Sequence, residues 1–359
     1  MRVIIATPLG RGGKGGIDRI MDEVAVELIH HPITGLHHRF LVTRGQRSAG
    51  FSAVQLPLAL AQLATLWTTG RADLVHINLS SHGSTSRKLI LAAACRRLGI
   101  PYILHVHGSR MRQYWLGAST RRQRQIVKMF ARAARVLVLG EIWRHFVAEQ
   151  VPAAKDRIMV LPNATRAACL SHIPDPTVRI LFLGRVGERK GVPQLIDALA
   201  RLPRDGRWRA TIAGDGDIDV ARERIAAAGL SAKVALPGWV GPEDVQRALA
   251  NADILVLPSF DENLPMSVIE GMAAGLAVVA TPVGATEEII HSGETGLLVP
   301  TGDVTALTSA LSLLVENKDL RDKLGAAAQS YHAQHLEIAP YVQRLSTIWH
   351  ASVESRIVN

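Results

Sequence analysis

Two glutamates, Glu262 and Glu270, are separated by seven residues in the second half of the chain. Pro265 between them favours the first turn of a helix, so we expect residues 265–274 to be helical, with Glu262 in the preceding loop and Glu270 in the second turn. Glu270 has small and apolar neighbours, and burying an ionised carboxylate among them is costly without hydrogen-bond donors. Sugar or ribose hydroxyls are suitable donors, and the exposed N-terminus of the helix can hold a phosphate.

Two cations lie in a glycine-rich loop that follows an expected strand. Residues 184–191 read Gly-Arg-Val-Gly-Glu-Arg-Lys-Gly, which places Arg185 and Lys190 five positions apart. Such a pair suits a pyrophosphate, each contact contributing about 1.5–3 kcal/mol as a charge-assisted hydrogen bond. Taken alone, the loop is explained equally well as a solvated turn with ordinary surface charges.

The first half of the chain has a glycine loop of its own. Gly10, Gly12 and Gly15 match the pattern G-x-G-x-x-G between an expected strand and an expected helix, which is the dinucleotide fingerprint. That fingerprint requires an acidic residue about 20 positions on, and none lies near the end of the second expected strand. An NADP site with Arg44 on the 2′-phosphate and a plain surface turn remain alternatives. We favour a loop whose backbone approaches a diphosphate, with the following helix N-terminus pointing at it.

The elements that position these loops follow one plan in both halves. Strand, glycine loop and helix occur twice, with the strands at residues 2–7 and 178–183. Further short apolar runs alternate with helical segments at residues 40–43, 74–77, 102–106, 136–139, 209–213, 233–236, 254–258 and 277–281. This alternation predicts the α/β class, with two doubly wound domains of parallel strands covered by helices on both faces. Ligands bind beyond the carboxyl ends of such strands, which predicts a site in a cleft between facing domains.

Taken in chain order, the motifs resemble a known family. They are the glycine loop with Gly15 and Gly16, His105-Val-His107-Gly108, Pro162-Asn163, Gly184-Arg185 with Lys190-Gly191, Ala213-Gly214-Asp215-Gly216, and Glu262 with Glu270. This set is similar to glycosyltransferase family 4, retaining enzymes with the GT-B fold of two Rossmann-like domains facing across a cleft. The resemblance spans nearly the whole chain. The chain departs from the family pattern at Asn263, where glycine is frequent, and at Ala164, where glycine usually follows the asparagine.

The resemblance also implies a domain division. We expect an acceptor-side N-terminal domain over residues 1–165 and a nucleotide-sugar-binding domain over residues 166–335, joined by the proline-containing segment 156–175. The last helix, expected from about Ile338 to Arg356 within residues 336–359, should pack back on the N-terminal domain, with Trp349 as a packing anchor.

The resemblance assigns a role to each matched residue. Arg185 and Lys190 would neutralise the nucleotide diphosphate, and Glu270 would bind the ribose hydroxyls. Glu262 would contact the donor sugar, and His107 would lie near it. The remaining donor contacts, many of them from the backbone, are implied for Gly15, Gly16, Val240 with its neighbours Gly238 and Trp239, Asn263, Leu264, Met266 and Ser267.

The implied reaction is the retaining transfer of a hexose from a UDP- or GDP-sugar to a glycan or lipid-linked sugar, in bacterial exopolysaccharide, lipopolysaccharide or glycolipid synthesis. Breaking the glycosidic bond develops negative charge on the leaving nucleotide, which Arg185, Lys190 and the helix N-terminus at Met266 can stabilise. The formal D-x-D of Asp215 and Asp217 coincides with the family's own Gly-Asp-Gly segment. We therefore expect no metal and no cofactor beyond the nucleotide-sugar co-substrate.

The positive charge is concentrated in the first half. The chain has a net charge of +10, yet residues 1–165 hold 23 Lys and Arg against 8 Asp and Glu. Residues 120–134 are expected to form a helix with a stripe of cations at three- and four-residue steps, namely Arg121, Arg124, Lys128, Arg132 and Arg135. We expect this half to contact anionic lipid head groups or a lipid-pyrophosphate acceptor, although a solvated helix face remains an alternative. Nucleic acid is disfavoured because aromatic stacking platforms are lacking there.

Composition excludes several other classes. With 48% hydrophobic and 20% charged residues the chain is no disordered tail, and two cysteines, Cys95 and Cys169, exclude a disulfide scaffold and a structural zinc site. The N-terminal apolar run is too short for a signal peptide, and residues 48–70, with Pro57, are expected to be a loop and a largely buried helix rather than a membrane span. We expect a cytoplasmic protein, with peripheral contact to the inner face of the cell membrane left open. An NADP-linked oxidoreductase and a non-catalytic membrane-binding protein on the same fold remain alternative functions.

Overall fold

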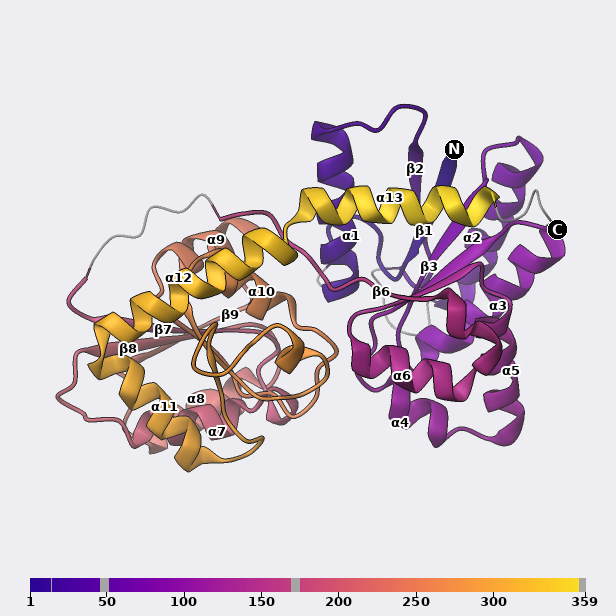
Figure 1. The fold of residues 1–359 in the computed structure, drawn as a ribbon. Coiled ribbons are helices and arrows are strands. Elements are labelled where there is room, and N and C mark those ends of the chain that lie inside the picture. The colour runs from indigo at the N-terminus through magenta and orange to yellow at the C-terminus, as the bar shows by residue number, and fades with distance from the viewer. Residues whose placement is uncertain (14, 46–51, 169–174, 355–359) are drawn as a thin grey trace. The chain divides into compact units, whose positions relative to one another are not determined.

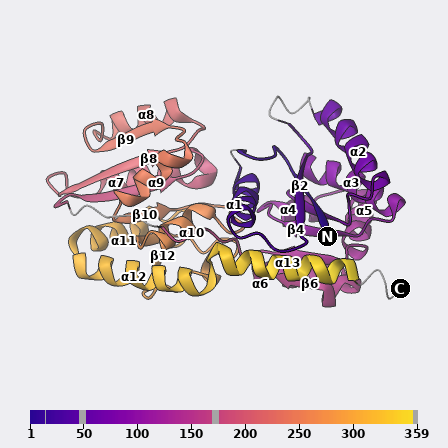
Figure 2. The ribbon, with the colours of Figure 1, turned by 90° about the horizontal axis from the view of Figure 1, so that it is seen from above.

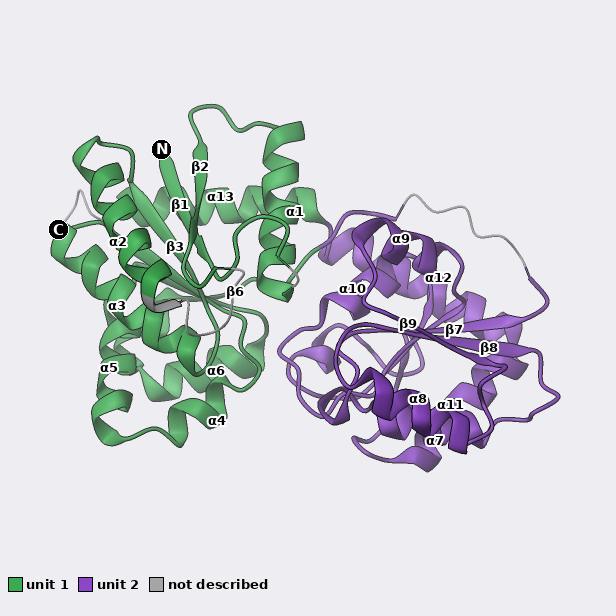
Figure 3. Ribbon diagram, turned by 180° about the vertical axis from the view of Figure 1, so that it is seen from behind, with its two compact units in different colours: residues 1–164, 338–359 green, residues 165–337 purple. Residues whose placement is uncertain are grey.

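The computed structural model describes residues 1–13, 15–45, 52–168 and 175–354 (Figure 1). It divides into two compact units (Figure 3), unit 1 with residues Met1–Ala164 and Ile338–Asn359 and unit 2 with residues Thr165–Glu337. The boundaries expected from the sequence, after residues 165 and 335, lie one and two residues away. Cys169, Lys14 and the end of the expected last helix at Arg356 lie outside the described residues.

Unit 1 contains a parallel sheet of six strands. They are β1 (Arg2–Thr7), β2 (His37–Val42), β3 (Leu74–Leu79), β4 (Tyr102–Val106), β5 (Arg135–Val138) and β6 (Ile158–Val160). Their order is β2-β1-β3-β4-β5-β6, so the chain reverses direction across the sheet between β1 and β3. All six residues of β3 and all five of β4 are buried, as expected for central strands covered on both faces.

Helices cover both faces of this sheet. They are α1 (Gly16–His30), α2 (Ser52–Thr68), α3 (Gly83–Leu98), α4 (Met111–Leu116), α5 (Thr120–Ala131), α6 (Glu141–Gln150), the 3₁₀ helix η2 (Pro152–Arg157) and α13 (Ile338–Glu354). Figure 2 shows α2, α3 and α5 on one face and α13 on the other, where α13 packs against α1 and β3.

Unit 2 has a second parallel sheet of six strands. They are β7 (Val178–Leu183), β8 (Trp208–Ala213), β9 (Val234–Gly238), β10 (Ile254–Leu257), β11 (Ala277–Ala280) and β12 (Leu297–Leu298). Their order, β12-β11-β10-β7-β8-β9, is that of a Rossmann sheet, and its reversal lies between β7 and β10.

The helices of unit 2 also lie on both faces of the sheet. They are η3 (Glu188–Lys190), α7 (Val192–Ala200), α8 (Ile218–Ala227), α9 (Pro242–Ala250), α10 (Met266–Ala273), η4 (Thr286–Glu288), α11 (Val304–Glu316) and α12 (Lys318–His335). Figure 3 shows α7, α8 and α11 on one face and α9, α10 and α12 on the other. The predicted fold class, two doubly wound α/β domains, is confirmed.

Two local predictions are wrong, and one strand was missed. The segment 156–175, expected to be only a connection, contains strand β6, and the two-residue strand β12 was not predicted. Both are short and lie at sheet edges, so neither has the long apolar run of a central strand. Pro265 precedes α10 as its N-cap in extended conformation instead of forming its first turn.

Two predicted helices also differ. Helix α5 ends at Ala131, Arg132 is its C-cap and Arg135 begins β5, so the expected stripe of five cations is reduced to three within the helix. Helix α2 is not largely buried. It packs on β2 and α3 through one side, and its opposite side leaves Val54, Leu58 and Trp67 exposed by 54%, 58% and 43%. No helix within the described ranges is long and apolar enough to cross a membrane.

Candidate functional site

The loops that carry Arg185, Lys190 and Glu262 follow two neighbouring strands of unit 2. One loop, residues 184–191, leaves β7, and the other, residues 258–265, leaves β10. These strands pair with Ile254 opposite Ile180, at the point where the strand order reverses. In doubly wound sheets the connections diverge there and leave a crevice at the carboxyl ends of the strands, where ligands bind. The predicted residues therefore lie where this fold accepts a ligand.

Glycines allow these loops to pack closely. Gly191 has φ of +69°, and a Cβ there would lie 2.0 Å from the carbonyl oxygen of Pro258. Gly214, with φ of +155°, faces Gly184 so closely that its Cβ would lie 1.7 Å from the Gly184 oxygen. Any side chain at either position would force the loops apart, because both positions combine an unfavourable φ with backbone contact.

Lys190 and Glu262 form an ion pair beyond the carboxyl ends of β7 and β10. The Lys190 ammonium donates to Oε1 of Glu262, which also accepts a hydrogen bond from Ser259 Oγ at 2.8 Å. Thr281 Oγ1 in turn donates to the Ser259 carbonyl at 2.6 Å. The Lys190 and Glu262 side chains are only 13% and 9% exposed, so water screens their attraction weakly. Lys190, expected to bind the diphosphate of a donor, and Glu262, expected to bind its sugar, are thus in direct contact.

Arg185 differs from Lys190 in its surroundings. Its side chain is exposed, and among the described residues no acceptor pairs with its guanidinium. Arg189 in the same loop was missed by the sequence reasoning. Its Nη1 donates to the Asp261 carbonyl at 2.9 Å, and its own carbonyl accepts from Phe260 N at 2.9 Å. Arg189 therefore connects the two loops. Its position in a glycine-rich loop, beside Lys190, was the sequence pattern that could have identified it.

Helix α10 begins directly after the loop that carries Glu262. Pro265 has no side chain that can cap the first amides, so the amides of Met266 and Ser267 have no cap at this helix start. Glu270 is 4% exposed in the second turn, as expected, and Asn263 and Leu264 are also buried. The amides at the start of α10 are therefore available to an anion.

The loop after β9 lies at the carboxyl edge of the same sheet. Gly238 ends β9 with φ of +77°, and its carbonyl accepts from Gly214 N at 2.8 Å. Trp239 is 50% exposed and Val240 is half-buried. The backbone expected to meet a nucleobase therefore lies on the same edge as the glutamate pair.

In unit 1, the glycine loop opens α1 as predicted. Gly15 is the N-cap of α1 and Gly16 is its first residue, and both are exposed. Side chains hold three amides of this loop: Asp18 Oδ1 accepts from Leu9 N at 3.1 Å, Thr7 Oγ1 from Gly10 N at 3.0 Å, and Asp22 Oδ2 from Gly12 N at 2.8 Å. The loop conformation is therefore set by carboxylates of α1 that the sequence reasoning did not use.

Lys88, one of the 23 Lys and Arg of residues 1–165, lies under this loop. Its side chain is 0% exposed. Its ammonium donates to Thr43 Oγ1 at 2.8 Å and to the Ala6 carbonyl at 3.3 Å, at the ends of β2 and β1. Burial, aided by the charge of Arg87, lowers the pKa of Lys88 to about 7, and the charge of Asp18 opposes this shift.

His107 belongs to a cluster of polar side chains on one face of the unit 1 sheet. Its Nε2 lies 2.9 Å from Asn78 Oδ1, and its ring lies 4.0 Å from that of His105. His105 Nδ1 lies 3.2 Å from Nε2 of His76. His76 and Asn78 were missed, although His-Ile-Asn on β3 has the same alternation as His-Val-His at β4 and thus predicts a shared face.

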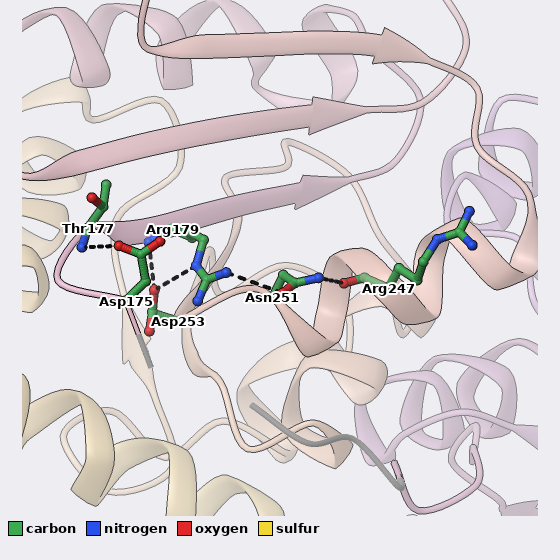
Figure 4. Close-up of polar contacts among 6 residues, drawn as sticks. All are labelled: Asp175, Thr177, Arg179, Arg247, Asn251 and Asp253. Atoms are coloured by element: carbon green, nitrogen blue, oxygen red, sulfur yellow. Dashed lines mark hydrogen bonds and ion pairs between the residues drawn. The ribbon is translucent and has the colours of Figure 1, made fainter. Parts of the chain in front are cut away.

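A cavity of about 590 Å³ lies at the opposite edge of the unit 2 sheet, at the amino ends of β7 and β8. Arg179 at this edge is already engaged, with its amide bonded to Asp253 Oδ2 at 2.6 Å and its guanidinium bonded to Asn251 Oδ1 at 3.2 Å (Figure 4). Since ligands of such sheets bind at the carboxyl ends, we do not assign the donor to this cavity. Within the part of the chain that the structure describes, no group of three or more His, Cys, Asp or Glu could hold a metal ion.

Comparison with known proteins identifies the family. Residues 2–164 match the family described as "Glycosyl transferase 4-like domain", and residues 171–331 match "Glycosyl transferases group 1". The chain is 30% identical over 307 residues to the 2-deoxystreptamine N-acetyl-D-glucosaminyltransferase of Streptomyces fradiae, covering 78% of this chain and 71% of that one. The chain belongs to the family 4-like glycosyltransferases.

Solved structures show the fold of this glycosyltransferase. The sucrose-phosphate synthase of Thermosynechococcus elongatus matches with a TM-score of 0.79 at 16% identity, covering 98% of each chain. Anabaena HepE in complex with UDP-glucose matches with a TM-score of 0.77 at 19% identity, covering 98% of the glycosyltransferase and all of HepE. At these identities the likeness establishes the GT-B fold.

Proposed function

We propose that this glycosyltransferase is a retaining hexosyltransferase that uses a UDP- or GDP-sugar and a glycan or lipid-linked sugar acceptor, in exopolysaccharide, lipopolysaccharide or glycolipid synthesis. The observation that carries the donor site is the contact between the loops that follow β7 and β10. It brings Lys190, Glu262 and the uncapped start of α10 together at the reversal of the sheet. The UDP-glucose named for the similar HepE structure agrees with a nucleotide-sugar donor.

The diphosphate is bound by Arg185, Lys190 and the amides of Met266 and Ser267. Arg185 is exposed and unpaired among the described residues, so it meets an arriving anion without first losing a partner. These groups stabilise the negative charge that develops on the leaving nucleotide, which is the task a metal ion performs in other transferases. The proposal therefore includes no metal and no other cofactor.

The ion pair of Lys190 and Glu262 competes with the binding of a donor to either side chain. A diphosphate takes the Lys190 ammonium, and Glu262 then accepts hydrogen bonds from hydroxyls of the donor sugar. Ser259 continues to donate to Glu262 and keeps its carboxylate in place. Donor binding thus replaces the hydrogen bond between Lys190 and Glu262 by bonds from each side chain to the donor. These new bonds lower the free-energy cost of separating two charges that water screens weakly.

The other donor contacts follow from position. Glu270 accepts from the ribose hydroxyls, and the backbone of Val240 meets the nucleobase. Asn263 and Leu264 present backbone to the sugar. Unit 1 contributes Gly15 and Gly16 to the β-phosphate and His107 to the donor sugar. The acceptor attacks the face that the nucleotide leaves, with no protein nucleophile.

The charge of the N-terminal half favours an anionic acceptor. The S. fradiae relative is named for 2-deoxystreptamine. Residues 1–165 of this chain hold 23 Lys and Arg against 8 Asp and Glu, and this charge attracts an anionic acceptor. We assign instead a glycan or a lipid-linked sugar as the acceptor. Exposed cations of α5, Arg121, Arg124 and Lys128, would face the anionic inner surface of the membrane.

A thermal-shift panel of UDP, GDP, ADP and NADP tests this function. A nucleotide at 100 times its dissociation constant stabilises the folded state by about 2.7 kcal/mol, which raises Tm by several degrees. We expect UDP or GDP to do this and NADP to have no effect. A shift with NADP alone would support the oxidoreductase alternative, and no shift with any nucleoside diphosphate would contradict the proposal.

A further inference from the structure

The C-terminal helix α13 is hydrogen-bonded to the histidine cluster of unit 1. Trp349 on α13 is 0% exposed, and its Nε1 donates to Nδ1 of His76 at 3.2 Å. Their rings lie 5.9 Å apart and are nearly perpendicular. Trp349 is therefore more than an apolar anchor, because the only polar atom of its side chain donates a hydrogen bond to a buried imidazole.

This bond sets the tautomers of two histidines. An indole nitrogen can only donate, so His76 Nδ1 must accept and the proton of the neutral His76 ring must be on Nε2. That Nε2 lies 3.2 Å from Nδ1 of His105, which must then accept. The proton of His105 is therefore on its own Nε2. A single donor on α13 thus determines the state of both rings.

All three histidines are neutral near pH 7. Burial, with the charges of His107 and Lys88, lowers the pKa of His76 to about 3. Burial alone lowers the pKa of His107 to about 3, and burial with the neighbouring histidines lowers the pKa of His105 well below its usual value. The tautomer argument therefore applies under physiological conditions.

His107 lies at the end of this chain of rings. Asn78 gives its amide nitrogen to the Ala6 carbonyl at 3.4 Å, which leaves its Oδ1 to accept from Nε2 of His107 at 2.9 Å. The proton of His107 is then on Nε2, and no residue that the structure describes donates to Nδ1, which keeps its lone pair. The ring of His105, 4.0 Å away and tilted by 44°, packs against His107 and limits its rotation.

Stability alone does not account for this cluster. His105 Nε2 is buried and has no acceptor among the described residues. An unsatisfied buried donor costs about 1–3 kcal/mol, and an apolar replacement of such a network is often neutral or stabilising. Unsatisfied buried groups in native proteins call for an explanation, and function is one.

We propose that Trp349, His76 and His105 are positioning residues for His107, which they hold in one orientation so that Nδ1 presents its lone pair to a hydroxyl of the donor sugar. The inference rests on the proposed function, because that function places His107 at the donor sugar. It adds that a residue of the last helix controls the orientation of a histidine that directly follows strand β4.

The test compares Trp349→Phe with Trp208→Phe. Both tryptophans are buried and use Nε1 as a donor, but Trp208 donates to the Pro203 carbonyl in unit 2, at 2.9 Å, and reaches no histidine. We expect Trp349→Phe to lower kcat for sugar transfer about tenfold with the donor KM changed less than twofold, because His107 contacts the sugar and not the nucleotide. Trp208→Phe should keep the wild-type kcat.

Nitrogen-15 NMR of the imidazoles gives a second readout that a merely structural role would not move. In the wild type, His76 and His105 should each show one protonated and one unprotonated nitrogen at neutral pH. In Trp349→Phe these resonances should move toward mixed-tautomer values, and those of His107 should shift with them. His76→Gln keeps a donor for His105 and should retain most of kcat, whereas His76→Phe should not.

Wild-type kcat in Trp349→Phe, or His107 resonances that do not respond, would overturn the inference. Its failure is distinct from that of the proposed function. If the wild-type protein transfers no sugar and binds no nucleoside diphosphate, the function fails, and the NMR comparison alone then decides whether Trp349 controls the orientation of His107.

Discussion

Replacing Lys88 with methionine should change how the stability of this protein depends on pH. The Lys88 side chain is 0% exposed and its ammonium is bonded to the neutral acceptors Thr43 Oγ1 and Ala6 O. Methionine has a similar length and shape and no charge. Both acceptors keep another bond, since Thr43 Oγ1 donates to the Thr7 carbonyl and Ala6 O accepts from Asn78. We therefore expect Lys88→Met to fold.

The sign follows from proton binding. Burial lowers the pKa of Lys88 from 10.5 to about 7 in the folded protein. Between these values the unfolded chain binds the proton and the folded chain does not, so the free energy of unfolding rises with pH. From pH 7 to pH 10 the wild type should gain about 3 to 4 kcal/mol relative to Lys88→Met, since each pKa unit is about 1.4 kcal/mol.

The measurement is urea unfolding followed by tryptophan fluorescence at pH 7, 8, 9 and 10, with the variant subtracted from the wild type at each pH. The subtraction removes the contribution of all other titrating groups. Lys318→Met serves as a control because that side chain is 74% exposed, and its curve should run parallel to the wild type. A difference that stays constant within about 1 kcal/mol across this range would refute the reasoning, because it would mean that folding does not displace the proton.

Four further predictions follow. Stability should fall as pH drops below 6.5, by about 1.4 kcal/mol per pH unit for each buried histidine, because burial depresses the pKa of His76 and His105 and only the unfolded chain binds their protons; urea unfolding of His76→Phe should show a shallower acid slope. Glu270→Ala and Arg185→Ala should each abolish transfer in a radiolabelled-sugar assay while leaving Tm within a few degrees, and unchanged turnover in either would defeat the site assignment. The rate of sugar transfer should be unchanged by EDTA, and a tenfold or greater loss of that rate would contradict metal independence. The fraction of protein that sediments with anionic vesicles should fall when four arginines are changed to glutamine, namely Arg121, Arg122, Arg124 and Arg132. Membrane contact would be contradicted if the wild type bound anionic and neutral vesicles equally and the variant bound as well as the wild type.

The strands were predictable because their signal is local. Buried parallel strands are short apolar runs, and the ranges predicted for β1, β4 and β7 agree with the structure at every residue. Edge strands β6 and β12 were not predictable in this way, because an edge strand of two or three residues needs no long apolar run. The end of α5 also escaped prediction, because Arg132 and Arg135 continue the helical spacing of charges although the backbone has already turned into β5.

The candidate site was predictable to the extent that its residues lie in short motifs. Arg185, Lys190 and Glu262 were chosen from loops next to apolar runs, and the structure places those loops after paired strands. The alternation on β3 and β4 predicts a shared face for these side chains, but the bonds of the cluster were not predictable, because they join residues far apart in the chain. His76 and His105 are 29 positions apart, and His76 and Trp349 are 273.

By itself the sequence determined the fold class, the family resemblance and the loops that carry the charged groups, since each depends on residue type and spacing within one segment. Only the tertiary structure decided which of those groups are buried and what they contact. Lys88 and Arg87 are adjacent in sequence, yet Lys88 is fully buried between the ends of two strands and Arg87 is only half-buried. Protonation, tautomer and pairing depend on distance and on exclusion of water, and both are set when segments remote in the chain pack together.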